Sequence, residues 1–268
     1  MLLEASNLTV VRGGRAILDN VSARFDAPGL VAVIGPNGAG KSTFLSALAG
    51  LLKPDAGEAR IEGAPVLSID RRKLAKRRAY LPQNARCEWP ISVERVVALG
   101  LTPTLPAFGD LNAGDKARVA AMLELCDLSA KQEQAATTLS GGELARTMLG
   151  RAMVGDPEIL IADEPIAGLD PRHALDAMHR LRAHSAKRRL VIVALHDLGL
   201  AAAFADRVIA IKDGAIAADG AADAVFTPAL LRDLFEVDAR IARDDAGVSI
   251  RFVDAGRLGG GAAGGPGL

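Results

Sequence analysis

The chain has 268 residues, enough for one large hydrophobic core or for a core with a subdomain. Its 32 Lys and Arg residues balance 32 Asp and Glu residues, so no global basic field points to nucleic acid as a partner. The two cysteines, Cys87 and Cys126, lack metal-type spacing and favour a reduced, intracellular compartment. The N-terminus has no basic leader, and no apolar run approaches the ~18 residues that a membrane helix needs.

Short β-like runs separated by turns are predicted for the N-terminal part of the chain, over residues 2–61. Among them, the apolar run 30–34 is typical of a buried strand, and a helix is predicted over 41–52, before Pro54. The segment between this strand and this helix reads GPNGAGKST, which matches the pattern GxxxxGK[ST]. The sequence therefore predicts a strand, a phosphate-binding loop and a helix, in that order.

This loop has the residue types that nucleotide phosphates require. Its glycines leave backbone N–H groups free to converge on phosphate oxygens, and the helix N-terminus adds a favourable partial charge. We expect Lys41 to reach the β- and γ-phosphates and the Ser42 hydroxyl to bind Mg²⁺, which accepts only a few protein oxygens. The predicted nucleotide-binding residues are Gly35, Pro36, Asn37, Gly38, Ala39, Gly40, Lys41, Ser42 and Thr43. Alone, the loop indicates only that a nucleoside triphosphate is bound.

A basic run, RRKLAKRR, lies at residues 71–78. It is compatible with a nucleic-acid patch, a surface near anionic lipid headgroups or a solvated helix face, and the balanced net charge favours the last. After the run and a short apolar stretch comes Gln83. An amide oxygen is a suitable ligand for Mg²⁺ or water, so Gln83 is a candidate catalytic and metal-binding residue, although most such glutamines lie in surface loops.

Helical composition dominates residues 84–139, with the clearest helices predicted over 92–99 and 112–126. The segment ends at the sequence LSGGE, followed by a stretch with helical spacing. Ser140 is a suitable N-cap, and the glycines after it leave the first N–H groups of this helix exposed. We therefore predict a second helix start that can bind an anion.

Two adjacent acids follow a predicted strand at residues 158–162. Asp163, at the strand end, can hold the hydration shell of Mg²⁺. Its neighbour Glu164 can orient or deprotonate an attacking water. Because the pair lies downstream of a phosphate loop, a hydrolytic site is favoured over two acids that merely begin a loop.

The β/α alternation continues toward the C-terminus. Strands are predicted over 190–195 and 207–211, and helices over 171–185 and 198–204. Asp170 precedes Pro171 as the capping residue of the first of these helices. His196 follows a strand and is either a satisfied histidine at a strand end or a donor beside the γ-phosphate. The Gly- and Ala-rich tail from about residue 256 is expected to be disordered.

Together these motifs resemble the ATP-binding cassette (ABC) ATPases, over nearly all of residues 2–239. GPNGAGKST is similar to the Walker A loop, Gln83 to the Q-loop glutamine, LSGGE to the signature motif, and ILIADE to Walker B with Glu164 as catalytic carboxylate. GLD, ending at Asp170, resembles the D-loop, and His196 the switch histidine. The resemblance implies that ATP and Mg²⁺ bind between two copies of the chain. One copy supplies residues 35–43 and the other supplies Ser140, Gly141 and Gly142.

The fold implied by this resemblance is α/β: a P-loop NTPase cassette with a mixed, mainly parallel sheet, an N-terminal antiparallel β subdomain and an inserted α-helical subdomain at about 84–140. We expect the cassette to occupy residues 1–240 and a C-terminal extension to occupy 241–268. Two positions depart from the family pattern. Arg12 stands where many relatives place an aromatic ring on adenine, and it either stacks on the base or lies in a solvated turn. Ile166 replaces a small hydroxyl residue.

The stretch after Gln83 and the segment LDPRHALDAM resemble the ATPases of bacterial importers for iron-siderophore complexes, haem and vitamin B12. This resemblance implies a homodimeric, ATP-hydrolysing subunit at the cytoplasmic face of the inner membrane, bound to integral-membrane permease subunits and served by an extracytoplasmic substrate-binding protein. Importers of zinc or manganese are the alternative. A soluble ABC ATPase that acts on nucleic acid or the ribosome is disfavoured, because the chain has neither a long coiled-coil insertion nor a second cassette.

Overall fold

The computed structural model describes residues 3–83, 85–106, 110–244 and 247–253 of the chain. The tail that the sequence predicts to be disordered, from about residue 256, lies outside these residues. Across the described ranges, no helix combines the length and the apolar character needed to cross a membrane.

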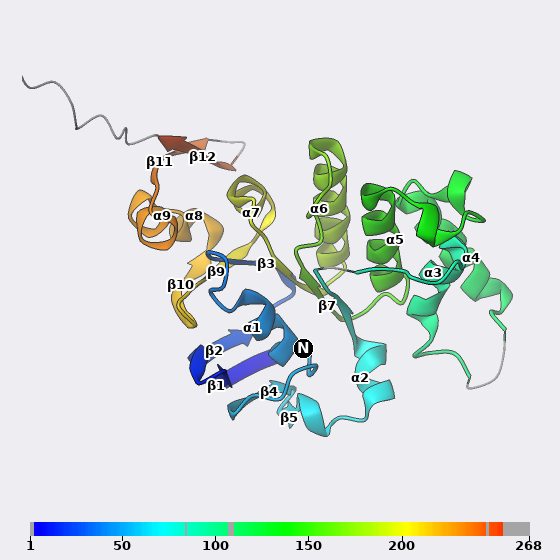
Figure 1. Cartoon of the computed structure of the whole chain (residues 1–268), viewed down its shortest axis with the longest axis horizontal. Helices are drawn as coiled ribbons and strands as arrows, with labels where there is room; N and C mark the ends of the chain where they lie inside the picture. Colours follow the sequence, from blue (N-terminus) through cyan, green and yellow to red (C-terminus); the bar gives the residue numbers. More distant parts are fainter. Residues whose placement is uncertain (1–2, 84, 107–109, 245–246, 254–268) are drawn as a thin grey trace, which may run out of the picture.

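A six-stranded sheet forms the centre of the molecule, in the order β10-β9-β3-β8-β7-β6 (Figure 1). Every neighbouring pair is parallel except β9 and β10. The inner strands β3, β7 and β8 are buried along almost their whole length, as their continuous apolar runs predict. The sheet consists of β3 (Gly29–Ile34), β6 (Arg78–Leu81), β7 (Ile159–Asp163), β8 (Leu190–Ala194), β9 (Arg207–Lys212) and β10 (Ala215–Ala221).

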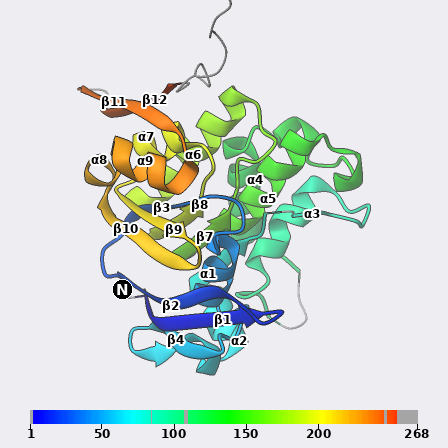
Figure 2. The same cartoon turned by 60° about the vertical axis from the view of Figure 1, so that its left-hand side comes forward.

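A second sheet is antiparallel and has the order β2-β1-β4-β5. Helix α1 (Lys41–Leu48) lies between the two sheets (Figure 2), where its Phe44 and Leu45 are fully buried in one apolar cluster with residues of both. The helix ends earlier than predicted, because Gly50 adopts φ 68° and turns the chain. The strands of this sheet, which confirms the predicted β subdomain, are β1 (Leu3–Arg12), β2 (Arg15–Phe25), β4 (Ala56–Ile61) and β5 (Ala64–Pro65).

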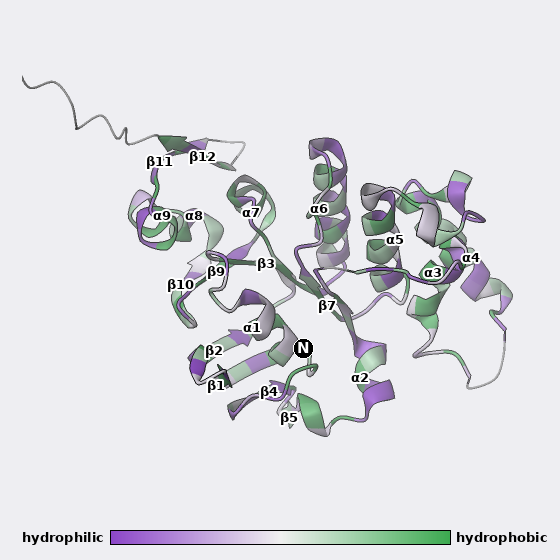
Figure 3. Cartoon of the chain, viewed as in Figure 1, coloured by the Kyte–Doolittle hydropathy of each residue, from purple (hydrophilic) through white to green (hydrophobic). Residues whose placement is uncertain are grey.

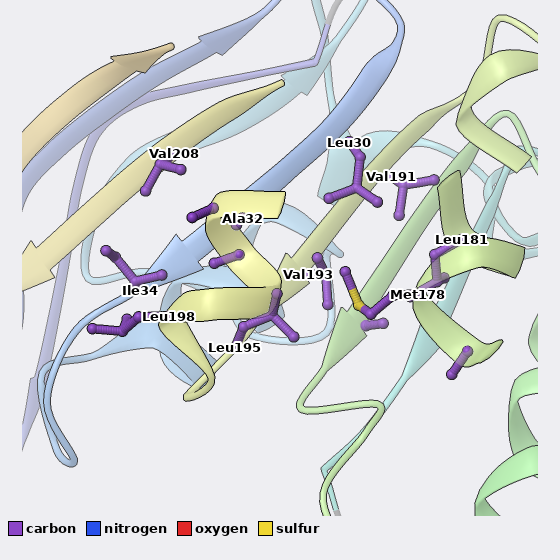
Figure 4. Close-up of a cluster of buried hydrophobic side chains, with 14 of the residues drawn as sticks. Leu30, Ala32, Ile34, Met178, Leu181, Val191, Val193, Leu195, Leu198 and Val208 are labelled. Carbon is purple, nitrogen blue, oxygen red and sulfur yellow. The ribbon is translucent and has the colours of Figure 1, made fainter. Parts of the chain in front are cut away.

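Helices cover the opposite face of the six-stranded sheet. Figure 4 shows Met178 and Leu181 of one helix and Leu198 of the next packed with apolar residues of β3, β8 and β9. Hydrophilic and hydrophobic residues share the surface of α6 in Figure 3, as expected of a helix with one buried face. The helices of this layer are α6 (Pro171–Ala186), α7 (Leu198–Phe204), α8 (Ala222–Val225) and α9 (Pro228–Phe235).

A separate group of helices lies on the side of the sheet that ends with β6 (Figure 1). It contains α3 (Val93–Ala98), α4 (Ala113–Leu125) and α5 (Gly141–Met153), and the first two match the predicted helices to within two residues. Helices α3 and α4 share an apolar cluster that is distinct from the two clusters on the sheet, whereas the buried apolar residues of α5, Met148, Leu149 and Met153, belong to the main cluster on the sheet. A core of its own supports the predicted helical subdomain, whose limits at about 84 and 140 stay a prediction.

The basic run forms α2 (Arg71–Arg77) and the first residue of β6. Arg77 pairs with Glu158 and with Glu62, and Arg72 donates to the carbonyl oxygens of Pro103 and Leu105. At least two arginines of the run, Arg72 and Arg77, therefore bind other groups of the same chain.

A C-terminal hairpin, β11 (Asp238–Asp244) and β12 (Gly247–Val253), was not predicted. Its residues Ile241, Val248 and Ile250 pack against the main apolar cluster, and the cassette boundary at residue 240 stays a prediction.

Candidate active site

The phosphate loop connects β3 to α1, and its glycines are there for steric reasons. Gly35 has φ 149°, and a Cβ atom on it would lie 2.1 Å from the carbonyl oxygen of Ile211. Gly40, the N-cap of α1, has φ 106°, and a Cβ atom there would lie 2.6 Å from the carbonyl oxygen of Ile17. No side chain fits at either position. The loop is therefore shaped by the close approach of two backbone segments, and α1 begins at Lys41 as predicted.

Lys41 is buried in this loop. Its Nζ donates hydrogen bonds to the carbonyl oxygens of Gly35 at 2.9 Å and Pro36 at 3.0 Å. Burial lowers the pKa of the Lys41 ammonium, whereas the carboxylates of Glu164 and Asp163 raise it. These two acids, together with the loop carbonyls, favour the charged form of the ammonium and oppose the effect of burial.

Four predicted site residues lie at the ends of neighbouring parallel strands. Gln83 follows β6, Asp163 is the last residue of β7 and Glu164 comes next, and His196 follows β8. Since β6, β7, β8 and β3 are adjacent in the sheet, their carboxyl ends meet at the same edge as the phosphate loop (Figure 1). The predicted residues from three distant parts of the chain thus meet in one place.

Glu164 is the centre of this group. Gln83 donates from Nε2 to Glu164 Oε2 at 2.6 Å, and His196 Nε2 is hydrogen-bonded to Glu164 Oε1. The Glu164 side chain is only 10% exposed, and its backbone has φ 52°, an uncommon value for a residue with a side chain. Its N–H donates to the carbonyl oxygen of Ala194 at the end of β8. The strained turn after β7 therefore aims the carboxylate between Gln83 and His196.

Asp163 provides a test of whether the site suits Mg²⁺. Its side chain is buried, and Oδ1 has no hydrogen-bond partner. Burial raises the pKa of the Asp163 carboxyl, and the Ser42 hydroxyl acts in the opposite direction. A carboxylate oxygen without a partner, next to a hydroxyl, is a donor set that a hard cation prefers. The described residues hold no cluster of three or more His, Cys, Asp or Glu side chains that could hold a metal ion.

The LSGGE segment begins α5 with a capping box. Ser140 Oγ accepts the N–H of Glu143 at 3.3 Å, and Glu143 Oε2 accepts the N–H of Ser140 at 2.9 Å. A Cβ atom on Gly141 would meet nothing within 4 Å. This confirms the predicted N-cap and the open helix start.

The structure does not join this helix start to the phosphate loop. Among the described residues, no hydrogen bond or ion pair links Ser140, Gly141 or Gly142 to residues 35–43. Gly141 instead shares a cleft of about 220 Å³ with Gln83 and Glu164. Within one chain, the start of α5 is thus close to Glu164 but is not bonded to the phosphate loop.

Asp170 caps α6 as predicted, and its carboxylate accepts the N–H of His173 at 2.9 Å. Arg12 lies at the end of β1, where it donates to the carbonyl oxygen of Val11 and lies 3.8 Å from Asp55. Ile166 lines an apolar pocket of about 420 Å³ beside His196. The roles of these residues stay predictions.

The sequence analysis did not identify the backbone at Ile17 as a neighbour of the phosphate loop. The carbonyl oxygen of Ile17 faces Gly40, and it would also lie 2.7 Å from a Cβ atom on Gly214. The N–H of Gly214 donates to the carbonyl oxygen of Ala39 at 3.1 Å. The glycine in the turn after β9 was the available signal, because only a residue without a side chain permits this approach.

Comparison with known proteins agrees with these features. A model of the family described as ABC transporter matches residues 18–167, more than half of the chain. The hemin import ATP-binding protein HmuV of Streptomyces coelicolor is 40% identical over 236 residues, which cover 88% of this chain and 84% of that protein.

Solved structures show the same fold. A dimeric ATP-binding cassette in a post-hydrolysis state, bound to ADP and Pi, superposes with a TM-score of 0.74 and 25% identity, covering 82% of this chain and 98% of that one. A protein described as a metal-chelate type ABC transporter, in an inward-facing conformation, superposes with a TM-score of 0.79 at 20% identity, covering 94% of this chain and 96% of that one. The chain belongs to the ABC transporter family, as an ATP-binding cassette that hydrolyses ATP.

Proposed function

We propose that this chain energises an importer of a metal chelate, with hemin as the first candidate cargo. The observation that carries the hydrolytic role is the hydrogen-bonded group of Gln83, Glu164 and His196 beside the phosphate loop. The cargo rests on the Streptomyces relative, which is a hemin import ATP-binding protein. Iron-siderophore and cobalamin-like chelates have the same support from the sequence, and importers of zinc or manganese are the alternative class.

ATP binds with its phosphates on the backbone N–H groups of residues 35–43. Lys41 exchanges the carbonyl oxygens of Gly35 and Pro36 for the β- and γ-phosphates, which requires only a rotation within the same loop. Glu164 orients a water molecule and accepts its proton, and the water oxygen attacks the γ-phosphorus. The bond from that phosphorus to the bridging oxygen breaks, giving ADP and inorganic phosphate. His196 donates toward the γ-phosphate and stabilises the charge that develops there.

The donor set supports Mg²⁺ as the accompanying ion. Asp163, with its unpartnered Oδ1, and Ser42 would hold it, and Gln83 would add an amide oxygen after leaving Glu164. When bound, Mg²⁺ neutralises part of the phosphate charge.

A second copy of the chain completes each site in this proposal. The start of α5 is open at Gly141, and the same-chain phosphate loop makes no bond to it. If Ser140, Gly141 and Gly142 of one copy address the γ-phosphate held by residues 35–43 of the other, both helix starts are used. The dimeric cassette that this chain resembles at 25% identity supports this arrangement, and Asp170 would lie near the seam.

The remaining partners follow from an import role. We place the dimer at the cytoplasmic face of the inner membrane, held there by integral-membrane permease subunits, with an extracytoplasmic protein that delivers the cargo. The balanced net charge supports membrane-protein partners over nucleic acid.

The test is reconstitution of the chain with its permease in lipid vesicles, with phosphate release measured as hemin is added to the cargo side together with the binding protein. We expect ATP hydrolysis to rise with hemin and with transported hemin. Zinc or manganese stimulation without a hemin effect would replace the cargo assignment. Absence of hydrolysis in the complete complex would overturn the function.

A further inference from the structure

We propose that Lys131 is a positioning residue for ATP, because it cancels the negative charge that Glu143 places at the start of α5. This inference rests on the proposed function, in which that helix start addresses the γ-phosphate of ATP held by a second copy. It concerns the LSGGE segment, whose fifth residue carries a charge that the phosphate must approach.

The three side chains form a closed set of contacts. Lys131, the last residue of the short helix η3 (Ser129–Lys131), places Nζ 2.5 Å from Glu143 Oε1. The other carboxylate oxygen accepts the N–H of Ser140 at 2.9 Å. The Glu143 N–H in turn donates to Ser140 Oγ at 3.3 Å. The carboxylate is therefore fixed in the first turn of α5, beside the residues proposed to meet the phosphate.

A carboxylate in this position stabilises the helix but disfavours the binding of a phosphate. It complements the positive end of the helix dipole, as a phosphate would, so the two anions compete for the same field. The hydrogen bond from Lys131, with that from the Ser140 backbone, lowers the pKa of Glu143 to about 2. Glu143 thus stays ionised at working pH, and the Lys131 ammonium is the group that offsets its charge.

Lys131 is expected to contribute little to folding stability. Its side chain is 38% exposed and that of Glu143 is 19% exposed, so solvent screens the ion pair. The capping box itself uses only Ser140 and Glu143, and glutamine in place of Glu143 can make the same hydrogen bonds. Loss of the lysine charge should therefore appear at the nucleotide rather than in the fold.

The experiment uses full-length chains that carry Glu164→Gln, so that ATP accumulates without turnover. Light scattering gives the ATP concentration at which half of the chains are dimeric. Lys131→Met should raise this concentration roughly 5- to 20-fold, the scale of one uncompensated charge near a phosphate. Lys131→Arg should restore it to within about 2-fold, since the charge is kept.

The decisive variant removes both charges. Lys131→Met with Glu143→Gln should return to within about 2-fold of Glu143→Gln alone, because no charge is left to offset. Lys116→Met is the matched control: Lys116 is an exposed lysine of α4, without an ion pair among the described residues, and its loss should change nothing. The melting temperatures of Lys131→Arg and Lys116→Met should agree with that of the parent within about 2 °C, and the double variant should agree equally well with Glu143→Gln alone.

The failures are separable. If the Glu164→Gln parent does not dimerise with ATP, the proposal that two copies share each ATP is wrong, and so is this inference. If the parent dimerises and Lys131→Met behaves like Lys116→Met, only the inference is overturned. If Lys131→Met weakens dimerisation but the double variant stays equally weak, the lysine acts through packing and the charge argument is wrong.

Discussion

The strand-end site and the start of α5 are both proposed to act on the γ-phosphate of ATP, yet they are built differently. At the strand ends, residues far apart in sequence contact one another, and Glu164 bonds both Gln83 and His196. At the start of α5, the contacts are local, made by the capping box and Lys131. A Cβ atom would collide with backbone at Gly35 but would meet nothing at Gly141.

This difference suggests that the strand-end residues serve the hydrolysis of ATP and that the start of α5 serves the pairing of two chains. The groups proposed to hold phosphate and to activate water are fixed by the fold of one chain. The start of α5 is formed by local contacts, and in the proposal its ligand is presented by a second copy. Substitutions in the first region should therefore damage folding or chemistry within a chain, whereas those in the second should mainly damage pairing, with at most about 1 kcal/mol of folding stability lost.

The largest effect is expected for Glu164→Gln. Loss of the proton acceptor should reduce phosphate release by roughly 10²-fold or more, the scale of a lost general base. ATP binding should be kept, because residues 35–43 are untouched. Phosphate release and equilibrium ATP binding measured on the same preparation check both parts. Near-normal hydrolysis would remove Glu164 from its assigned role.

A pair of glycine substitutions sharpens the comparison. Gly35→Ala should destabilise the chain by about 2–3 kcal/mol, because its Cβ atom would lie 2.1 Å from the Ile211 carbonyl oxygen. Gly141→Ala should change stability by less than about 0.5 kcal/mol, since the space there is open. Urea unfolding gives both values. Equal destabilisation by the two would show that the start of α5 is part of the folding core.

Lys41→Ala tests the phosphate loop itself. The ammonium makes charge-assisted hydrogen bonds, so its loss should weaken ATP binding about tenfold or more. Since burial lowers the pKa of Lys41, the variant should not lose folding stability at pH 7. Calorimetric ATP titration measures the affinity, and an unchanged affinity would contradict the assignment.

The smallest effect concerns pH. The pKa of Glu143 is about 2 in the folded chain against an ordinary value of 4.5, so its contribution to stability is full above about 4.5 and is lost as pH falls from there toward 2. Solvent screening keeps this contribution near or below about 1 kcal/mol. Urea unfolding of the native chain and of Glu143→Gln should differ at pH 7, and the difference should shrink below about pH 4.5 and approach zero only toward pH 2. A difference that grows on acidification would have the wrong sign.

The sequence was most informative where rules of parallel sheets apply. Asp163 was predicted at the end of a buried parallel strand, whereas the shared site with Gln83 and His196 was implied by the resemblance to ABC ATPases. The structure brings the three together because carboxyl ends of parallel strands share an edge. The helix starts at Lys41 and Ser140 were predicted equally well, from the glycine pattern and the capping pattern of the sequence.

Contacts set by tertiary packing could not be predicted. Nothing in the local sequence indicates that Ile17 approaches the loop, or that both oxygens of Glu164 are already bonded. The hairpin after residue 240 was missed although Val248, Ile250 and Phe252 alternate with polar residues. That alternation is a strand signal, but its buried face exists only because the main cluster is there to receive it.

The central claim, that each ATP lies between the phosphate loop of one copy and the start of α5 of the other, is tested most directly by mixing two defective chains. In a Glu164→Gln background, one carries Lys41→Ala and the other Gly141→Glu. In their mixed dimer both defects fall in one site and the other site is intact. With differently tagged chains, we predict that ATP pairs the mixture, with one ATP per dimer, and pairs neither variant with itself. Self-pairing equal to mixed pairing, or no pairing in the mixture, would contradict the account.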